Sequence, residues 1–322
     1  METEQAINFT GAAKRKPGQV RINDRSLQQL LEEHLAWLED RPNGRRADLT
    51  GTTLSELDLQ RVNLSKAILQ EASLLESDLS GANLSGADLE GADLRRTTWL
   101  GADLGGANLS KAKADHCWLA EANLSEAILR GVSFRGASLQ AARVLEANIH
   151  GCDFRTAVLK SASFHHAMVF ECCFDEVNLE GALFYHANIN LSRFVSAKGA
   201  GANFTLAKVR DCDFRGSQLT CGKFFKADLS RCAFGRALLS DCDFRECCLR
   251  GADFSNAILK SSRFSEASLQ AADLRWTNLT GARELTCRQL SEARTAEGTL
   301  LPNGTCGPYM KGSMAERPVL RG

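Results

Sequence analysis

Histidine is the residue best suited to acid–base or metal chemistry, and this 322-residue chain has only six. Three of them, His165, His166 and His186, gather in one stretch. No serine, histidine and aspartate can be assigned as a nucleophilic set, and no glycine-rich loop leads from a strand into a helix. His166 and His186 would give a metal ion only two ligands, which is too few. We therefore predict no catalytic residues, no metal site and no cofactor.

Cysteine is the other reactive residue type, with 12 copies. Seven cysteines lie two residues before a large apolar residue, in a position that elsewhere holds Ala. These are Cys117, Cys152, Cys172, Cys212, Cys232, Cys242 and Cys247. A free thiol in such a position packs as a small hydrophobic side chain. We expect packing rather than disulfides or metal binding, which agrees with a reducing cytoplasm.

The element that must position all of these residues is a five-residue repeat. Every fifth residue from Leu49 to Leu279 is Leu, Phe, Val or Ile, with only Trp99, Ala114 and Gly199 as exceptions. A helix has a period of about 3.6 and a strand a period of 2, so neither explains the pattern. Strand alternation places the small and the large residue of each unit on the inside, and the next two residues must turn a corner.

A second period sets the length of a coil. Phe occupies every tenth position from Phe134 to Phe264, except at Val144. Four corners close a square coil of 20 residues, so two opposite faces carry Phe and two carry aliphatic residues. Because parallel connections are right-handed in nearly all cases, the pattern predicts an all-β, right-handed quadrilateral parallel β-helix, a β-solenoid with short helical caps.

These residues resemble the pentapeptide-repeat family, whose motif is Ala or Cys, then Asp or Asn, then Leu or Phe, then any two residues. Ala87-Asp88-Leu89 and Ala252-Asp253-Phe254 are clear copies. The resemblance implies the same four-sided β-helix and says little about activity, because fold does not carry function.

The ends of a solenoid need covers. Residues 1–22 are expected to be a flexible tail, and 23–46 a capping helix that begins with a capping box at Ser26 and Gln29. The solenoid is predicted over 47–283. Residues 284–322 are expected to hold a second capping helix, opened by Thr286 and Gln289, and a loose tail from about residue 302.

The outward positions change character near the middle of the repeat. Elsewhere they are mostly Ser, Arg, Glu, Gly and Lys, but here they become apolar and aromatic. The candidate partner surface consists of His165, His166, Phe170, Leu183, Tyr185, His186, Leu206 and Phe225. Contiguous exposed apolar patches mark interaction sites, although large side chains could also simply cover the corners. Gly199 occupies a core position, which favours a local bulge.

The first functional hypothesis is a non-enzymatic, rod-like scaffold or adaptor that presents flat faces to a protein partner in the cytoplasm. No stretch is apolar enough for a membrane span, so no membrane partner is expected. A second hypothesis comes from the family resemblance, since some members are implied to mimic DNA and bind type II topoisomerases such as gyrase in quinolone resistance. A third is an accessory adaptor of a bacterial secretion system.

Charge discriminates among these hypotheses. From 47 to 130 there are 13 acidic and seven basic residues, but from 131 to 283 there are 15 acidic and 19 basic. DNA mimicry requires dense negative charge, and direct nucleic-acid binding by the weakly basic half is not expected because carboxylates interleave. The resemblance further suggests a homodimer through the C-terminal cap, with Trp276, Leu285 and Leu290 as candidate contacts.

Overall fold

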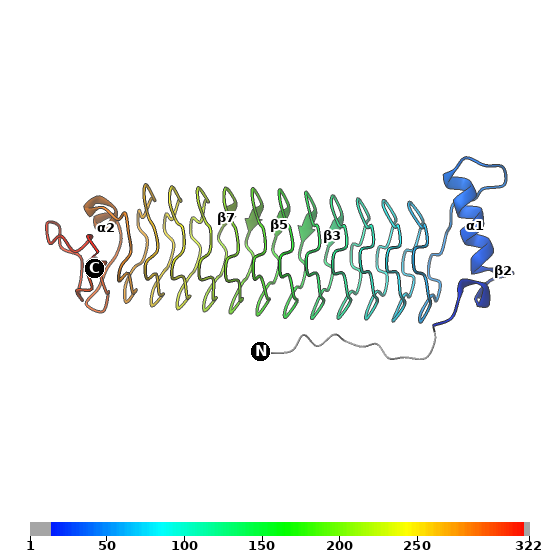
Figure 1. The fold of residues 1–322 in the computed structure, drawn as a ribbon, viewed down its shortest axis with the longest axis horizontal. Helices are drawn as coiled ribbons and strands as arrows, with labels where there is room; N and C mark the ends of the chain where they lie inside the picture. The colour runs from blue at the N-terminus through cyan, green and yellow to red at the C-terminus, as the bar shows by residue number, and fades with distance from the viewer. Residues whose placement is uncertain (1–13, 319–322) are drawn as a thin grey trace.

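The computed structural model describes residues 14–318 and has the form of a straight rod of stacked coils (Figure 1). Helix α1 (Leu27–Leu38) covers one end of the rod, and helix α2 (Cys287–Glu292) lies at the other. No helix among the described residues is long and apolar enough to cross a membrane.

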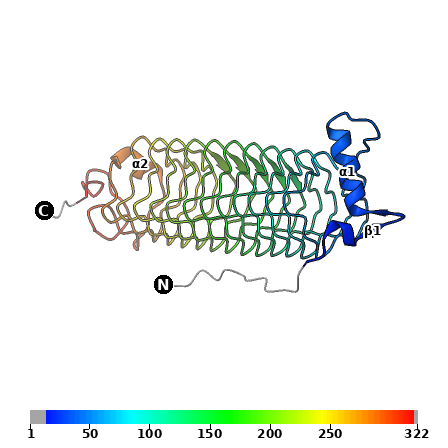
Figure 2. The same cartoon turned by 45° about the vertical axis from the view of Figure 1, so that its right-hand side comes forward.

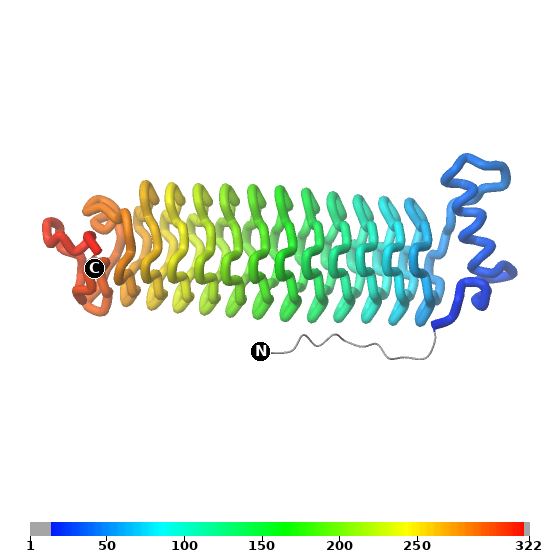
Figure 3. The backbone as a smooth tube through the Cα atoms, viewed as in Figure 1, coloured from blue at the N-terminus to red at the C-terminus, as the bar shows by residue number. Residues whose placement is uncertain are grey.

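The coils repeat every 20 residues, as Figure 3 shows in the even spacing of the tube. Parallel bridges join each residue of the ladder to the residue 20 positions later, for example Asp88 to Asn108 and Asp93 to Lys113. Four such bridges occur in each coil, so the solenoid has four sides. The prediction of a quadrilateral parallel β-solenoid with short helical caps is confirmed.

Most bridges are single, but one side of the rod carries a continuous parallel sheet in its middle (Figure 2). Its strands are β3 (Ile128–Arg130), β4 (Asn148–His150), β5 (Met168–Phe170), β6 (Asn188–Asn190) and β7 (Lys208–Arg210). The strands pair in register in the order β3-β4-β5-β6-β7. We call the outward surface of this sheet the strand face.

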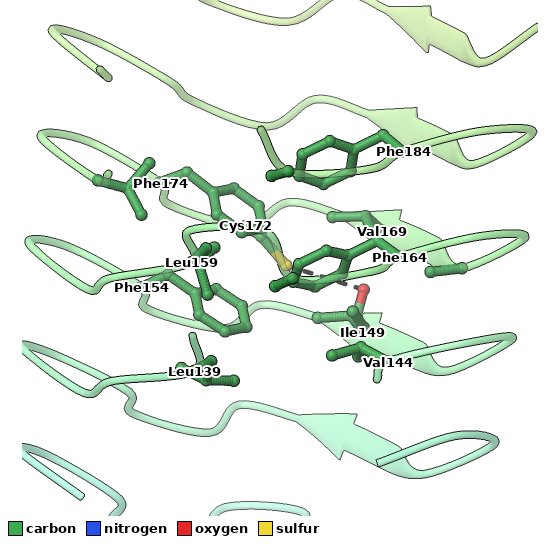
Figure 4. Close-up of a cluster of buried hydrophobic side chains, with 14 of the residues drawn as sticks. Leu139, Val144, Ile149, Phe154, Leu159, Phe164, Val169, Cys172, Phe174 and Phe184 are labelled. Carbon is green, nitrogen blue, oxygen red and sulfur yellow. Dashed lines mark hydrogen bonds between the residues drawn. The ribbon is translucent and has the colours of Figure 1, made fainter. Parts of the chain in front are cut away.

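A continuous cluster of buried apolar side chains fills the interior along the rod. Phe side chains one coil apart stack face to face, with ring centroids 4.6 to 5.3 Å apart. The two Phe columns meet edge to face at 6.0 to 6.4 Å, the arrangement that the quadrupole of an aromatic ring favours. Figure 4 shows Phe154 and Phe174 in one column beside Phe164 and Phe184 in the other.

The corners use one left-handed residue each. It stands two positions after the large residue and has a φ near +60°, whether or not it is glycine. Most of these residues are polar or small, but three in the repeats are large and apolar: Leu191, Leu206 and Trp276. A bulky apolar side chain is unusual in this conformation, so these three corners differ from the rest of the rod.

Gly199 does not form a bulge, and that expectation is wrong. The ladder continues through its unit, because Gly199 donates its N–H to Gln218 O at 2.8 Å and Lys198 bridges Gln218. There is also no free space, since a Cβ on Gly199 would lie 2.7 Å from Cδ2 of Leu219. The side chain of Leu219 on the next coil fills the volume that a larger residue would occupy.

The N-terminal cap is larger than expected. Residues 14–22 do not form a loose tail: Arg15 pairs with Leu57 of the first coil, and the short 3-10 helix η1 (Pro17–Gln19) contacts α1. The strands β1 (Arg21–Ile22) and β2 (Arg25–Ser26) form a hairpin that leads into the helix. The remaining residues of the predicted tail, 1–13, lie outside the described residues.

His34 joins α1 to the first coil. It is fully buried, accepts a hydrogen bond from Ala47 N at 3.1 Å through Nδ1, and contacts Ser65 O at 3.0 Å through Nε2. Because Nδ1 must accept, Nε2 carries the proton and the ring is neutral. Burial lowers the pKa of His34 from its ordinary value of 6.5, and the positive charge of Arg46 adds to this.

The C-terminal cap also differs from the prediction. The segment from 302 to 318 is not a loose tail, because Leu301 and Ala315 are buried and Asn303 N donates to Ala315 O at 3.2 Å. Leu285 and Leu290 are buried against the last coil. They are therefore unavailable as dimer contacts, and that part of the prediction is wrong. Trp276 remains 58% exposed.

Phe204 tests the core. Its ring stacks on Phe184 and Phe224 at 4.7 and 5.3 Å, so Phe204→Ala should reduce the free energy of unfolding by about 3–5 kcal/mol through lost burial and a cavity. Denaturant unfolding measures this loss. The control Thr205→Ala, at an outward position on the same coil, should change stability little. A loss at Phe204 no greater than that at Thr205 would contradict the stacked core.

His34 should make the N-terminal cap sensitive to acid. Its pKa is lowered in the folded state, so the unfolded chain binds a proton first, and stability falls as the pH drops below about 6.5. Trp37 stacks on His34 with centroids 5.6 Å apart, so its fluorescence should report loosening of α1 between neutral and acidic pH. In His34→Gln, which cannot titrate, this change should disappear; an unchanged pH response would contradict the assignment.

Candidate interaction surface

The strand face carries the largest exposed apolar side chains of the middle coils. Met168 is 53% exposed and Phe170 is 39% exposed, and both project from β5. Leu191, at the corner that follows β6, is 50% exposed. The ring of Phe170 stacks on that of His150 in the neighbouring strand, with centroids 5.4 Å apart.

The adjoining corner extends this surface. His166 and His186 stack in parallel at 5.0 Å, and Tyr185 meets His186 edge to face at 4.3 Å. His165 packs against Tyr185 at 5.8 Å. We define the mid-rod patch as the exposed aromatic and apolar residues of β5 on the strand face, of the adjoining corner, and of the corner that follows β6. They are His165, His166, Met168, Phe170, Tyr185, His186 and Leu191.

The patch contains almost no charge. Twelve outward positions belong to the two central coils of this region, from Ser163 to Glu171 and from Leu183 to Leu191, and Glu171 is the single Asp, Glu, Lys or Arg among them. Its carboxylate lies 3.5 Å from Nε2 of His150. The coil that lies four coils after the Ser163–Glu171 segment gives a comparison. Four of its six equivalent positions are charged, namely Asp243, Arg245, Glu246 and Arg250. The low charge is therefore a local property and not a general one of the repeat.

The corners beside the strand face use a different hydrogen bond from most corners of the rod. At an ordinary corner the N–H of the small inward residue donates to the carbonyl of the large residue three positions earlier, as Ala157 N does to Phe154 O at 3.0 Å. At the corner after β4, Cys152 N instead donates to Cys172 Sγ at 3.4 Å. One coil later, Cys172 N donates to Ser192 Oγ at 3.1 Å.

The carbonyls released at these corners are taken by thiols. Figure 4 shows the Cys172 Sγ donating to Ile149 O, at 3.7 Å, and Cys152 Sγ donates to Leu129 O at 3.0 Å. Cys212 and Cys232 do the same to Ile189 and Val209. The five strands stand at five successive corners that lack the usual turn hydrogen bond. Leu57 and Cys242 lack it as well, since their N–H groups donate to Ser77 Oγ and Ser262 Oγ, but no strand adjoins them. The Cys and Ser residues therefore accompany the strand face and do not by themselves produce it.

Six of the eight residues predicted as a partner surface lie in or beside the mid-rod patch. His165, His166, Phe170, Tyr185 and His186 belong to it, and Leu206 is the next corner residue in the column of His166 and His186.

Leu183 and Phe225 are less accessible than expected. Leu183 is half-buried in a bridge between Ser163 and Asn203. Phe225 is separated from Tyr185 by Thr205, and its ring is covered by Lys226 Nζ at 5.1 Å and by the Arg245 guanidinium at 5.4 Å.

Sequence reasoning missed Met168 and Leu191, which are more exposed than any predicted apolar residue of the patch. Both were visible in the sequence. Met168 stands one residue before a core position, where Asp and Asn are the commonest residues, and Leu191 takes a corner position that is otherwise almost always polar or small. The physical signal for Leu191 is its φ of 52°, which only the structure supplies.

Within the patch, the side chain of His165 favours its neutral form. Burial lowers the pKa of His165, and the nearby rings of His166 and His186 lower it further. Among residues 14–318 no group of three or more His, Cys, Asp or Glu side chains is arranged to hold a metal ion. The surface as described is thus an apolar, aromatic one.

A shallow groove of about 420 Å³ runs over the strand face. Phe170, Met168 and His150 line its apolar part, and three asparagine side chains, Asn148, Asn188 and Asn190, together with Arg130, line the rest. The rings of Phe170 and His150 stack on each other along the rod axis, so their faces are already in contact. They therefore present only edges and side-chain ends to a partner.

The cysteines are free and mostly inert. All 12 are unpaired, and the seven that were predicted to face inward are buried. Burial raises the pKa of Cys117 and of Cys242, so these thiols stay protonated at neutral pH. The prediction of packing rather than disulfides is confirmed.

The charged side chains elsewhere on the rod neutralise one another. Arg155 binds Asp153, and Arg215 binds Asp213, each with two N–H groups between outward positions of a single unit. The guanidinium of Arg275 lowers the pKa of Asp273 in the same way. No outward column of the described repeats carries Asp or Glu on more than two successive coils. The rod has no continuous acidic face.

Comparison with known families explains the repeat. The profile "Pentapeptide repeats" matches residues 58–96, 87–125, 117–155, 223–260 and 247–283, and "Pentapeptide repeat region" matches 167–240. The chain belongs to the pentapeptide-repeat family. Among curated proteins, no sequence matches this member of the family significantly.

Solved structures of the family are similar to this chain. One is a pentapeptide repeat protein from the thylakoid lumen of Arabidopsis thaliana, with 31% identity over 30% of this chain and 68% of its own, and a TM-score of 0.30. HetL, involved in heterocyst differentiation regulation in the cyanobacterium Nostoc, has 27% identity over 77% and 93%, and a TM-score of 0.23. QnrB1, a plasmid-mediated fluoroquinolone resistance protein, has 18% identity over 66% and 85%, and a TM-score of 0.28.

The Cys column gives a testable consequence. Cys172→Ala removes the acceptor for Cys152 N and the donor to Ile149 O, so it should cost about 1–3 kcal/mol of unfolding free energy and increase hydrogen exchange at the Cys152 amide. Cys172→Ser keeps both groups and should cost less. Cys117→Ala, at a corner with the usual turn bond from Cys117 N to Ala114 O, is the matched control. Equal losses at both cysteines would contradict this account of the strand face.

Proposed function

We propose that this protein is a non-catalytic, rod-like scaffold that binds a protein partner through the mid-rod patch. The observation that carries the proposal is the combination of exposure and low charge there. Met168, Phe170 and Leu191 expose apolar side chains around a stretch in which Glu171 is the only Asp, Glu, Lys or Arg. Contiguous exposed apolar surface of this kind is costly in water and marks protein interaction sites.

The chemistry of the patch fits a protein surface better than a small molecule. The groove over the strand face is shallow and open, whereas small-molecule sites enclose most of their ligand. Aromatic side chains and Met are enriched at the centres of protein interfaces, and Lys, Glu and Asp are depleted there. The patch has this composition, with asparagines that can pair with polar groups of a partner.

A rigid platform strengthens such binding. The patch rests on an in-register sheet and on stacked rings, so its side chains lose little additional freedom when a partner docks. Pre-organised surfaces lower the entropic cost of association. A secretion-system adaptor would use the patch in the same way and would differ only in the identity of the partner.

Type II topoisomerase is not included in the proposal. A surface that imitates DNA needs closely spaced negative charges along its length. Here the carboxylates of Asp153, Asp213 and Asp273 are paired with arginines in their own units. Residues 47–130 carry 13 acidic and seven basic residues, but no outward column of the described repeats carries Asp or Glu on more than two successive coils, so the closely spaced row of charges is missing.

Site-specific photocrosslinking in cells that naturally express the protein tests the proposal. Benzoylphenylalanine in place of Tyr185 should give a defined protein adduct, because the ring would lie inside the interface. The same group in place of Thr156, an exposed corner residue on the other side of the rod, is the control and should give none.

Competition separates a specific complex from chance capture. Excess unlabelled protein should remove the adduct at Tyr185, whereas excess Met168→Glu, Leu191→Glu protein should not, since two buried carboxylates oppose an apolar partner. Equal labelling at both positions, or no adduct at either, would contradict the proposal.

A further inference from the structure

We infer that the mid-rod patch binds a second copy of this chain, with two rods packed antiparallel, strand face to strand face, about a twofold axis that passes through Met168. This inference rests on the proposed function and names its partner. It is argued from how the shapes and charges along the patch change from coil to coil.

The geometry of the repeat makes the contacts of such a pair easy to deduce. A twofold axis perpendicular to the rod keeps each outward column opposite itself but reverses the order of the coils. Met168 and Phe170 then face their own copies on the axis. Residues one coil after the axis face residues one coil before it, because the strands pair in register at 20-residue spacing.

Shape is complementary in this register. Leu191, which is half exposed at a positive-φ corner, faces Gly151 of the second copy. A Cβ built on Gly151 meets nothing within 4 Å, so the space beside it is open. The projecting side chain on one rod therefore lies opposite a position without a side chain on the other, which we call the recess, and the twofold axis makes this contact twice.

The polar groups are complementary as well. Glu146 of one copy faces His186 of the other, and Asn148 faces Asn188, whose amides can donate to and accept from each other. Glu146 and His186 stand in the same column two coils apart, about 10 Å, and the ring of His166 stacks on His186 from the coil between them. They can therefore pair with each other only between two rods.

A parallel arrangement of the two rods fits less well. A twofold axis along the rod would place Leu191 against His186, two projecting corners, and would place Lys208 against Arg210, two cations. The antiparallel pair has like charges at Arg130 against Arg210 and, on the axis, at Glu171 against itself. Arg210 is bound to Asp228 and Glu171 lies 3.5 Å from His150 in its own chain, which reduces both repulsions.

A charge exchange tests the register directly. The mass of the full chain, measured by light scattering and by sedimentation over a concentration series, should rise from monomer to dimer. Glu146→Lys removes the carboxylate that can accept a hydrogen bond from the His186 ring, and His186→Glu places a carboxylate opposite Glu146, so each should weaken dimerisation by about tenfold. The double variant places an ammonium opposite a carboxylate at both positions and should recover the wild-type dissociation constant.

Three further variants complete the design. Glu176→Lys changes an exposed corner residue on the other side of the rod and should leave the dissociation constant unchanged. Gly151→Lys fills the recess for Leu191 and should abolish the dimer; the fold tolerates it, since Glu171 and Asp211 occupy the same corner position with φ near 54°. Glu171→Gln removes the like-charge contact on the axis and should strengthen association.

The outcomes are distinct from those of the crosslinking experiment. A wild-type chain that stays monomeric at every concentration, a double variant that does not recover, or a Glu176→Lys effect equal to that of Glu146→Lys would each overturn the inference. A monomeric chain that still crosslinks a different protein at Tyr185 would overturn this partner and leave the proposed function intact. Crosslinking to a second copy at Tyr185, together with recovery in the double variant, would establish the pair.

Discussion

The hydrogen-bonded ladder between successive coils is the interaction on which the rest of this structure depends. It requires every residue to lie above the residue 20 positions earlier, about 4.8 Å away. Side chains therefore meet their own column rather than a varied neighbourhood. Phe stacks on Phe, Asp lies near Asn, and any residue type that suits one coil must also suit the coils above and below. A change at one position, such as Gly199, is absorbed by the adjacent coil, where Leu219 fills the space.

The same ladder explains how the interior shapes the surface. Cys and Ser in place of Ala at Cys152, Cys172 and Ser192 offer an acceptor to the backbone N–H one coil away. That hydrogen bond replaces the usual turn bond beside the central strands. The outward side chains of β4, β5 and β6 include no Asp, Glu, Lys or Arg, whereas β3 and β7 carry Arg130, Lys208 and Arg210. The low charge is thus confined to the central three strands of the sheet.

Electrostatics divides the rod into two kinds of surface. Outside the patch the surface is charged, and in several units Arg and Asp pair with each other, as Arg155 does with Asp153. In the mid-rod patch these pairs are missing, and aromatic stacks such as His166 on His186 take their place. A balanced, self-paired surface gives a partner little to bind, because its charges are already satisfied. The patch differs because its apolar groups are satisfied only by burial.

The sequence by itself determined the coil, its 20-residue length, the Phe columns, the inward cysteines and the helices at both ends, because each depends on a local period or a short capping motif. It also located most of the patch, from Phe170 to His186. Only the tertiary structure decided the sheet of β3–β7, the exposure of Met168 and Leu191, and the burial of Leu285 and Leu290. These depend on hydrogen bonds and packing between residues 20 or more positions apart, which no local pattern specifies. For the same reason, residues 14–22 and 302–318, which lack periodicity, pack on the ends of the rod where open coils offer them a surface.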